Sequence, residues 1–422
     1  MKDKLRFAGN LSFVIFLLLL LFSFAMFQGG FVSWFLFFAS LPIFLYHLGL
    51  LFYPIKNWHV TRDLSRYVTR AGDHIQVNLR IKRSIPYPLY YCICEELFPD
   101  TLQKADNYLE RYRLLRKPEK RHMTREIKKV VFPGFKRNID MPYSIEQIPR
   151  GEHRLRAVRI RTGDVFGIVK KEHIFYVDDR IVVFPNERSV RITENINSYD
   201  QGSASSHAVN LKNTNVATGI REYMPGDKFS WIDWKQTARK NTVITKEFEQ
   251  EKSTDTLVIL DACHDQGLNE LAFETAIELT MSLLESIQKQ VSQTGFLSIG
   301  EGTVYFPVHH DPGKKDWIRR HLTRIQPGGT IPFAVKLREK IMQIPSGTNM
   351  ILVTTHLETE LQDVIKQMRQ RTRNLVVILI QASSLISTYE QNMIRRLRSE
   401  GVVINVLTEN ELAGNIIEVK SV

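Results

Sequence analysis

The hydrophobic and polar positions divide this chain into stretches with different periods, and the first stretch is apolar throughout. From Phe7 to Ile55 the sequence contains no Asp, Glu, Lys or Arg. About 20 apolar residues cross the hydrocarbon core of a bilayer, so this stretch is long enough for two crossings. Gln28-Gly29-Gly30 is the natural turn between them. The pattern therefore predicts two transmembrane helices, over residues 7–27 and 31–53.

Basic residues flank the two helices and predict their orientation. Positive charges near transmembrane helices stay on the cytoplasmic side, so both ends of the hairpin and the chain after it should be cytoplasmic. The alternative is a cleaved signal peptide, because Ser23-Phe24-Ala25 resembles a small-x-small site. If the first helix were removed in this way, the second helix would still direct the remaining chain into the cytoplasm. The predicted location is the cell membrane, with two passes and cytoplasmic C-terminal domains. The flanking basic residues are Lys2, Lys4, Arg6, Lys56, Arg62, Arg66 and Arg70.

Residues 56–200 show the period-two alternation of half-buried strands. In "GDHIQVNLRIKRS" the apolar Ile75, Val77, Leu79 and Ile81 alternate with polar residues, as in a strand with one face in a core. Several further runs of this kind are separated by Gly, Pro and Asp, which predicts a small antiparallel sandwich. Residues 100–130 are strongly polar, and we expect a solvated hairpin or loop there.

Residues 256–422 alternate strand-like runs with helical stretches. "DTLVILD" (255–261) precedes a helix over about 269–290, and then come "GFLSIG" and "TVYFPV", separated by Glu301-Gly302. Alternating strands and helices predict a parallel sheet with helices on both faces. The short connection predicts a hairpin, whose second strand is antiparallel. No G-x-G-x-x-G follows the first strand, so a dinucleotide-binding fold is disfavoured.

A parallel sheet with an edge hairpin is similar to the von Willebrand factor type A fold. That resemblance implies a Mg²⁺ site built from D-x-S-x-S, a later Thr, and an Asp that follows a Thr. The sequence has Asp261-Ala262-Cys263-His264-Asp265, then Thr330, then Thr354-Thr355-His356. A thiol replaces a hydroxyl and the last acid is missing, whereas Mg²⁺ requires hard oxygen ligands. We expect no metal. A retained site would use Asp261, Asp265 and Thr330; otherwise Asp261 caps the next helix or accepts from a loop amide.

The stretch "GIREYMPGDKFSWIDWKQTARKNTVITKEFEQE" (Gly219–Glu251) precedes the first strand of this α/β region, and we call it the signature segment. "GIREY" and "NTVITKEFEQE" predict strands, and "MPGD" predicts a turn. "DKFSWIDWKQTARK" predicts a helix with Asp227 as its N-cap and with Trp231, Trp234 and Ala238 on one face. Its charges are nearly balanced, which favours a mutual salt-bridge network over a phosphate-binding site.

Charge and cysteine content narrow the classes of function. The chain carries 57 Lys and Arg against 45 Asp and Glu, a formal net charge of +12. No nucleic-acid recognition module or aromatic platform accompanies this charge, so attraction to the anionic inner leaflet explains it more simply. Three cysteines, two of them spaced Cys92-x-Cys94 in a strand-like run, argue against a disulfide scaffold and against a zinc site.

"REYMPGD", "IDWKQTARK" and "ITKEFEQE" closely resemble the signature of the bacterial domain of unknown function 58 family. "RGEHRLRAVRIRTGDVFGI" resembles a second segment of that family, although Glu152, Val165 and Ser230 depart from its usual residues. Members are typically encoded beside a MoxR-type AAA+ ATPase and often beside a membrane-bound transglutaminase-like protein, which implies a membrane-anchored partner of an ATPase. The signature or interaction residues that the resemblance implies are Arg221, Glu222, Tyr223, Pro225, Gly226, Asp227, Asp233, Trp234, Lys235, Ala238, Arg239, Glu247 and Glu249.

The sequence shows no nucleophile–base pair, and together with the resemblance this predicts a non-catalytic membrane adaptor without a cofactor or a nucleic-acid partner. The alternatives are a metal-dependent ligand-binding module of the von Willebrand type, or an enzyme that uses carboxylates and a metal. In the adaptor we expect Trp231 and Trp234 to be buried in an elbow between two domains; the alternative is a partner contact face. The predicted parts are the hairpin (1–55), a sandwich-like domain (56–200), the elbow region (201–255) and the α/β domain (256–422).

Overall fold

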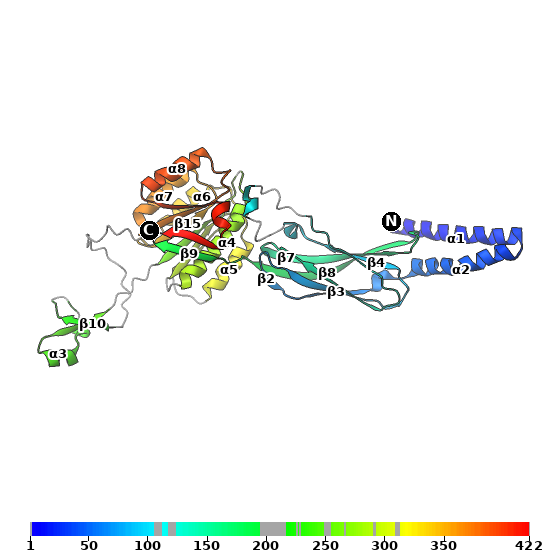
Figure 1. Cartoon of the computed structure of the whole chain (residues 1–422), viewed down its shortest axis with the longest axis horizontal. Coiled ribbons are helices and arrows are strands. Elements are labelled where there is room, and N and C mark those ends of the chain that lie inside the picture. The colour runs from blue at the N-terminus through cyan, green and yellow to red at the C-terminus, as the bar shows by residue number, and fades with distance from the viewer. Residues whose placement is uncertain are drawn as a thin grey trace. The chain divides into compact units, whose positions relative to one another are not determined.

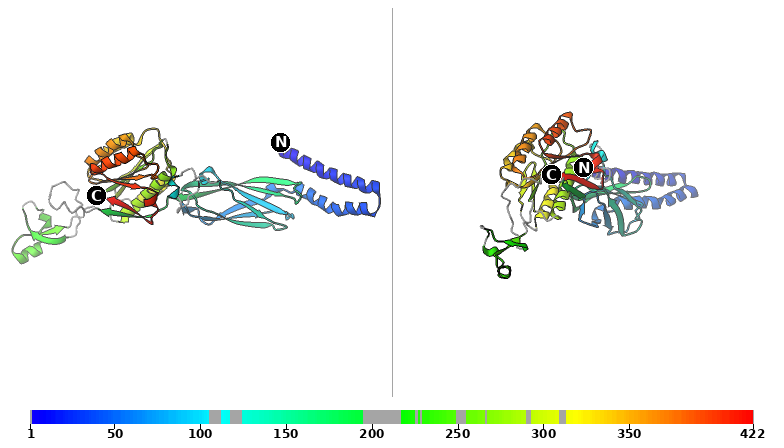
Figure 2. Two further views of the ribbon diagram at one scale, coloured as in Figure 1. Left: turned by 45° about the horizontal axis from the view of Figure 1, so that its top comes forward. Right: turned by 60° about the vertical axis from the view of Figure 1, so that its left-hand side comes forward.

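The computed structural model describes residues 2–104, 112–116, 124–194, 217–224, 227, 229–248, 255–265, 267–289, 293–308 and 313–421. These residues form helices and several separate sheets (Figures 1 and 2). The chain divides into two compact units, Met1–Asn186 and Glu187–Val422. The first unit contains the apolar N-terminus and the β-rich region, and the second contains the signature segment and the α/β region.

The apolar N-terminus forms two long helices, α1 (Lys2–Gln28) and α2 (Phe31–Phe52), which pack against each other. Gly29 and Gly30 turn the chain between them with φ angles of 54° and 105°, which glycine adopts more readily than other residues. Phe7–Gln28 and Phe31–Phe52 are long and apolar enough to cross a membrane. The predicted pair of apolar helices is confirmed.

The strands of the first unit are β1 (His59–Leu64), β2 (Val68–Arg70), β3 (Ile75–Lys82), β4 (Tyr91–Leu97), β5 (Lys128–Val131), β6 (Asn138–Ile145), β7 (Gly151–Gly163) and β8 (Lys170–Phe184). They form two sheets with the orders β1-β3-β6 and β2-β8-β7-β4-β5. Neighbours are antiparallel except for the parallel pair β2–β8. Leu79 from the first sheet and Ile160 from the second belong to one hydrophobic cluster, so the two sheets enclose a shared core.

A buried arginine joins the two sheets. Arg62 on β1 donates hydrogen bonds to the carboxylates of Glu96 on β4 and Asp179 on β8, at 2.7 and 2.8 Å. It also donates to the carbonyls of Leu155 and Val177, at 3.0 and 2.9 Å. A buried charge is tolerated only with such partners. Arg62 therefore belongs to the core, and its charge, which the sequence analysis counted beside the membrane, is neutralised within the sandwich.

The loop after β7 fastens α2 to the sandwich. The Asp164 carboxylate accepts hydrogen bonds from the amides of Phe166 and Val169, at 3.1 and 2.7 Å. It also lies 2.9 Å from Nε2 of His47 on α2, and both of these side chains are buried. The Phe166 ring lies 5.9 Å from the His47 ring. One carboxylate thus fixes the shape of the loop and its contact with the helix.

The second unit is built on a six-stranded sheet with the order β14-β13-β12-β15-β16-β17. Strand β14 is antiparallel to β13 and the other neighbours are parallel, so the predicted edge hairpin is confirmed. Helices α6, α7 and α8 share a core with the sheet, whereas α4 packs on β12, β15 and β16 (Figure 1). The elements are β12 (Thr256–Asp261), α4 (Glu270–Lys289), β13 (Thr294–Ile299), β14 (Thr303–Phe306), α5 (Lys314–Arg324), α6 (Phe333–Ile341), β15 (Asn349–Thr354), α7 (Thr359–Arg371), β16 (Leu375–Ile380), α8 (Thr388–Ser399), β17 (Val403–Leu407) and α9 (Glu409–Leu412).

The boundary between the units lies earlier than residue 200, where the predicted β-rich domain ends. Strand β9 (Ser189–Glu194) pairs in parallel with β18 (Ile416–Ser421) at the end of the chain. Arg188 donates a hydrogen bond to the Leu412 carbonyl at 2.9 Å. Residues 189–194 therefore belong to the second unit. Their alternating pattern is compatible with a strand in either unit. Only the strand with which they pair shows to which unit they belong.

Cysteine labelling tests the predicted topology. Gly29→Cys should react with a membrane-impermeant maleimide on intact cells, because the turn between the helices is predicted to lie outside. Tyr176→Cys should react only after lysis; Tyr176 is 85% exposed, so burial would not prevent its labelling. The native Cys92, Cys94 and Cys263 are buried and should give little background. Labelling of Tyr176→Cys on intact cells would reverse the predicted orientation.

Candidate functional site

The signature segment folds around one ion pair. Its described elements are β10 (Ala217–Glu222), η5 (Phe229–Trp231), α3 (Trp234–Lys240) and β11 (Ile244–Phe248), with β10 antiparallel to β11. Two nitrogens of Arg221 lie 2.9 and 2.7 Å from the two carboxylate oxygens of Asp227. The Met224 amide donates to the same carboxylate at 2.9 Å. The Arg221 guanidinium and this amide hold the pKa of Asp227 below its ordinary value.

The helix of this segment is capped by Asp233, and the predicted cap Asp227 is wrong. The Asp233 side chain accepts hydrogen bonds from the backbone amides of residues 235 and 236, at 3.1 and 3.2 Å. Satisfying these first amides is what an N-cap does. Asp227 is occupied by Arg221, so the helix begins after Asp233 and is shorter than the sequence predicts.

The later start of the helix changes the role of the tryptophans. Trp231 lies in η5 and therefore does not share a helical face with Trp234 and Ala238. Trp234 is 66% exposed, whereas Ile232 and Ile244 are 7% and 3% exposed. The interior of the segment is formed by the two isoleucines. Trp234 is therefore not packed inside the segment's own fold, and its burial between two domains stays a prediction.

The other predicted signature residues differ in how the structure places them. Glu222 is exposed at the end of β10, and Tyr223 is half-buried beside Phe229, with ring centroids 6.5 Å apart. On α3, Lys235, Ala238 and Arg239 are exposed. Glu247 pairs with Gly219 across the β10–β11 ladder. Outside the described part of the chain lie Pro225, Gly226, Glu249 and the side chain of Glu247.

Substitution of Asp227 tests whether its ion pair holds the segment together. Asp227→Ala should remove hydrogen-exchange protection from both β10 and β11, because it leaves Arg221 and the Met224 amide without their acceptor. Asp233→Ala should cost about 1 kcal/mol, as loss of an N-cap does, and should affect α3 first. Lys235→Ala, at an exposed position, is the control and should change neither. Unchanged protection of β10 and β11 in Asp227→Ala would contradict this account.

At the carboxyl edge of the six-stranded sheet, Asp261 is buried and bonded within the protein. Its Oδ1 accepts from the Cys263 amide at 3.1 Å, and its Oδ2 accepts from the Thr354 hydroxyl at 2.8 Å. Burial raises the pKa of Asp261 to about 6. The hydrogen bond from the Cys263 amide is the loop-amide role that the sequence analysis gives as the alternative to metal binding.

Beside Asp261 the sheet brings together three titratable side chains. One of them is far from the other two in the sequence, and those two were not predicted as site residues. Nε2 of His356 lies 3.0 Å from the Asp265 carboxylate and 3.4 Å from the Glu358 carboxylate. One ligand atom from each of the three lies within 4.8 Å of the others, so the group has the spacing of a metal site. Asp265 is also a predicted residue of a retained site, whereas His356 and Glu358 are not.

The charge on His356 decides how this group behaves. Burial by itself lowers the pKa of His356. The carboxylates of Asp265 and Asp261 raise this pKa by more than burial lowers it, and the result is a pKa of about 9. The imidazole is therefore protonated at neutral pH, and a metal that binds here must displace this proton. The imidazolium thus supplies the positive charge that the surrounding acids require. The signal in the sequence is His356 directly after Thr354-Thr355, where the family pattern has Thr-Asp.

Thr330, the third residue of a retained metal site, lies in a loop at the same edge of the sheet. The Gly328 amide of this loop donates to the Ala262 carbonyl at 3.0 Å. Thr330 is exposed. Lys336 extends into the same region, where its Nζ donates to the Gly300 carbonyl. A second cation thus lies at this edge and is held by backbone.

Titration of His356 tests the account of this site. In the full chain with ¹³C-labelled histidine, the His356 ring should titrate near pH 9. Because its folded-state pKa is raised, its contribution to stability is complete below about pH 6.5 and is lost as the pH rises through about 9. Asp265→Asn should move the pKa back toward the ordinary value, and His356→Gln assigns the resonance. A pKa near 6.5 in the unmodified protein would contradict the account.

Metal addition gives a second, independent result. Millimolar Mg²⁺ should leave the pKa of His356 unchanged, because the proton already satisfies the acids around it. A metal bound by Asp265 and Glu358 would compete with this proton and lower the pKa. If Mg²⁺ lowered the pKa in the unmodified protein and had no effect in Asp265→Asn, the site would bind metal.

These observations define a protein with two apolar helices long enough to cross a membrane, a two-sheet domain, an α/β unit and a small self-contained signature fold. The family described as "Protein of unknown function DUF58" matches residues 219–387. The "Uncharacterized protein YeaD" of Bacillus subtilis (strain 168) is 30% identical over 388 residues, which cover 92% of each chain. The chain belongs to the DUF58 family.

Solved structures add little to this assignment. The PilB minor pilin from Streptococcus sanguinis aligns over 77% of this chain and 85% of its own, with 9% identity and a TM-score of 0.27. Spo0M, a sporulation control protein from Bacillus subtilis, aligns over 30% of this chain and 49% of its own, with 14% identity and a TM-score of 0.15. Scores this low carry no information on the fold of this chain.

Proposed function

We propose that this protein is a non-catalytic membrane-anchored adaptor whose signature segment binds a MoxR-type AAA+ ATPase, the partner that the family resemblance implies. The observation that carries the proposal is the 66% exposure of Trp234. The segment is held together by the Arg221–Asp227 pair and by the Asp233 cap, so its own fold does not use this ring. Tryptophan is enriched among the residues that dominate binding energy at protein interfaces.

Other apolar side chains of the segment are also exposed. Phe229 is 76% exposed and Met224 is 63% exposed, and both lie in the same short segment as Trp234. The segment from Trp234 to Lys240 contains no acid, and its cations are exposed. A partner surface with an apolar pocket and acidic residues at its rim would match this set. The cations are Lys235, Arg239 and Lys240.

The α/β unit is proposed as the scaffold that carries this segment. Its sheet is parallel apart from strand β14 at one edge, which supports a von Willebrand factor type A-like fold for residues 256–422. The metal-dependent form of that fold is the alternative function, favoured by the spacing of Asp265, His356 and Glu358. A metal there would have to displace the proton of His356, which already supplies a cation to the acids.

The two nucleophile candidates that the structure brings into view do not support an enzyme. Cys263 is 3% exposed, and burial together with Asp261 raises its thiol pKa to about 12. The reactive thiolate is therefore scarce at neutral pH. Ser298 lies 2.7 Å from Nε2 of His321, but Ser298 is 1% exposed within β13. A substrate cannot reach a hydroxyl that is buried in this way.

Binding of the ATPase by matched tryptophan variants tests the proposal. The full chain in detergent is immobilised, and a purified MoxR-type ATPase from the same organism is titrated. Trp234→Ala should weaken binding by at least about 30-fold, the effect of removing an interface hot spot of about 2 kcal/mol. Hydrogen exchange of β10 and β11 should not change, because Trp234 is not part of the segment's core.

The matched control is Trp317→Ala on α5. Trp317 is 62% exposed, so this variant removes the same side chain at similar exposure outside the signature segment, and binding should be unchanged. Equal affinity of Trp234→Ala and the unmodified chain would overturn the proposed contact face. Loss of exchange protection in Trp234→Ala, together with weaker binding, would instead restore the elbow interpretation.

A further inference from the structure

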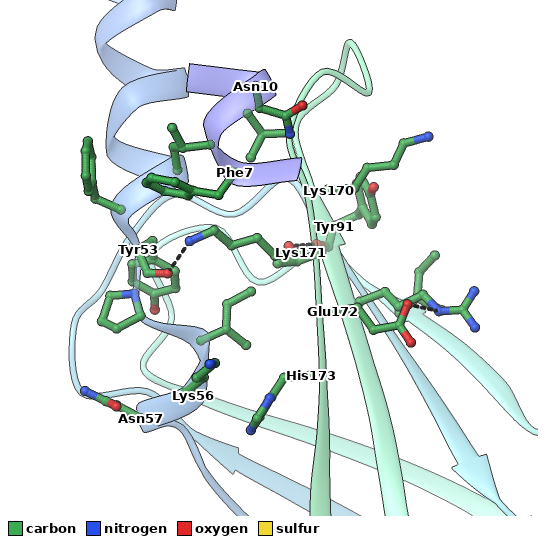
Figure 3. Close-up of a pocket in the computed structure, with 18 residues that line it drawn as sticks. Phe7, Asn10, Tyr53, Lys56, Asn57, Tyr91, Lys170, Lys171, Glu172 and His173 are labelled. Atoms are coloured by element: carbon green, nitrogen blue, oxygen red, sulfur yellow. Dashed lines mark hydrogen bonds and ion pairs between the residues drawn. The ribbon is translucent and has the colours of Figure 1, made fainter. Parts of the chain in front are cut away.

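Within the first unit, the helix ends and the sandwich enclose a cavity of about 730 Å³ (Figure 3). Its walls come from the beginning of α1, the end of α2 with the residues that follow it, and the ends of β4, β7 and β8. Figure 3 shows the Lys171 side chain extending across the cavity toward Tyr53, with Phe7 on the side of α1. The adaptor proposal makes no use of this cavity.

One part of the cavity wall is apolar and is formed by the two helices. Phe7 on α1 and Phe52 on α2 have ring centroids 5.7 Å apart in an edge-to-face arrangement. They are 38% and 63% exposed, and Leu51 continues the apolar wall beside them. Both aromatic residues belong to the stretches that are long enough to cross a membrane. The apolar wall therefore continues the surface that faces hydrocarbon in a membrane.

Lysines also line the cavity, and none of them is paired with an acid among the described residues. The Glu172 carboxylate lies 3.1 Å from Arg159 and 3.5 Å from Arg161, so this acid is shared by arginines. Figure 3 shows Glu172 turned toward an arginine and away from Lys171. Among the described residues of the chain, no ion pair involves the three lysines that line the cavity. These are Lys56, Lys170 and Lys171.

Lys171 is the most enclosed of the three lysines. Its Nζ donates one hydrogen bond, to the Tyr53 carbonyl at 2.6 Å, although an ammonium group can donate three. Burial lowers its pKa to about 8, which shows that its charge is poorly solvated. An anion placed beside Nζ would supply a further acceptor and favour the charged form.

The loop that fastens α2 places this cavity at the surface of a membrane. From His47, which contacts Asp164, to Phe52 at its end, helix α2 rises about 7–8 Å. The loop after β7 therefore lies beside α2 and contacts it before the apolar stretch of the helix ends. Its Val165 and Phe166 are 59% and 68% exposed, and exposed apolar side chains in such a position insert into the interface of a bilayer. With these two helices in a membrane, the cavity beside the end of α2 would lie at the level of lipid headgroups.

We propose that this cavity binds one anionic phospholipid of the surrounding leaflet. Lys56 and Lys171 hold the phosphate, and Phe7 and Phe52 contact the beginning of an acyl chain. The combination of lysines with an apolar wall, at the level of the headgroups, distinguishes this site from diffuse attraction between a basic domain and an anionic surface. Free phosphate has the same anionic chemistry without the acyl chain, and the experiment separates the two.

Native mass spectrometry of the delipidated full chain in detergent tests the proposal. Phosphatidylglycerol and phosphatidylcholine with the same acyl chains are the lipid probes, and inorganic phosphate is the third. One phosphatidylglycerol should bind per chain, at least about tenfold more tightly than phosphatidylcholine. The double variant Lys56→Gln/Lys171→Gln should weaken phosphatidylglycerol binding about 30-fold, since two lysine contacts are lost.

A charge-matched control separates a site from general attraction. Lys82 and Lys136 are exposed lysines of the same unit outside the cavity, so Lys82→Gln/Lys136→Gln should change the affinity by no more than roughly twofold. If the double variant does not fold, Lys56→Gln alone, at an exposed lining position, should still weaken binding about fivefold.

Three outcomes would overturn the proposal: equal affinity for the two lipids, equal losses in the two double variants, or inorganic phosphate bound as tightly as phosphatidylglycerol. The last result would identify a soluble phosphate ligand. Trp234 is unchanged in all of these variants, so either result leaves the ATPase proposal to its own test.

Discussion

The absence of charge from the two N-terminal helices is the constraint on which the first unit depends. No acidic or basic residue lies between Phe7 and Ile55, so the two helices are suited to a region without water. The sandwich begins where these helices end. Asp164 holds this junction, since its carboxylate binds amides of its own loop and contacts His47. The lysines and the apolar wall of the cavity meet at this junction, and its position follows from the same constraint.

Internal pairing separates the charged side chains that stabilise the fold from the side chains on which the two binding proposals rest. Arg221 is paired with Asp227, and His356 lies among the acids at the sheet edge. A paired charge gains little from a new partner, because its existing partner would be left exposed or unsatisfied. The exposed Trp234 and the lysines around Lys171 are in the opposite situation. The acids of the signature, which look most like an active site in the sequence, instead stabilise the fold that presents Trp234.

Much of the fold could be predicted from local pattern. Period-two alternation identified the strand of Ile75 to Ile81, and the short Glu301-Gly302 connection identified the hairpin that gives β14 its antiparallel direction. The errors are also instructive. Asp227 and Asp233 are both acceptable N-caps. The choice between them depends on the contact of Arg221 with Asp227, which the periodicity of a helix does not predict. The shared helical face of Trp231 and Trp234 was inferred from a helix that begins too early.

The sequence by itself determined the paired apolar helices, the family, and the alternation that produces each sheet, because these depend on neighbours within a few residues. Only the tertiary structure decided that β9 pairs with β18, that Asp265 contacts His356, and that Lys171 lies across a cavity from Phe7. Each of these contacts joins residues far apart in the chain. Their distances are set by sheet order and by the docking of α2, and neither is encoded in the period of any one segment.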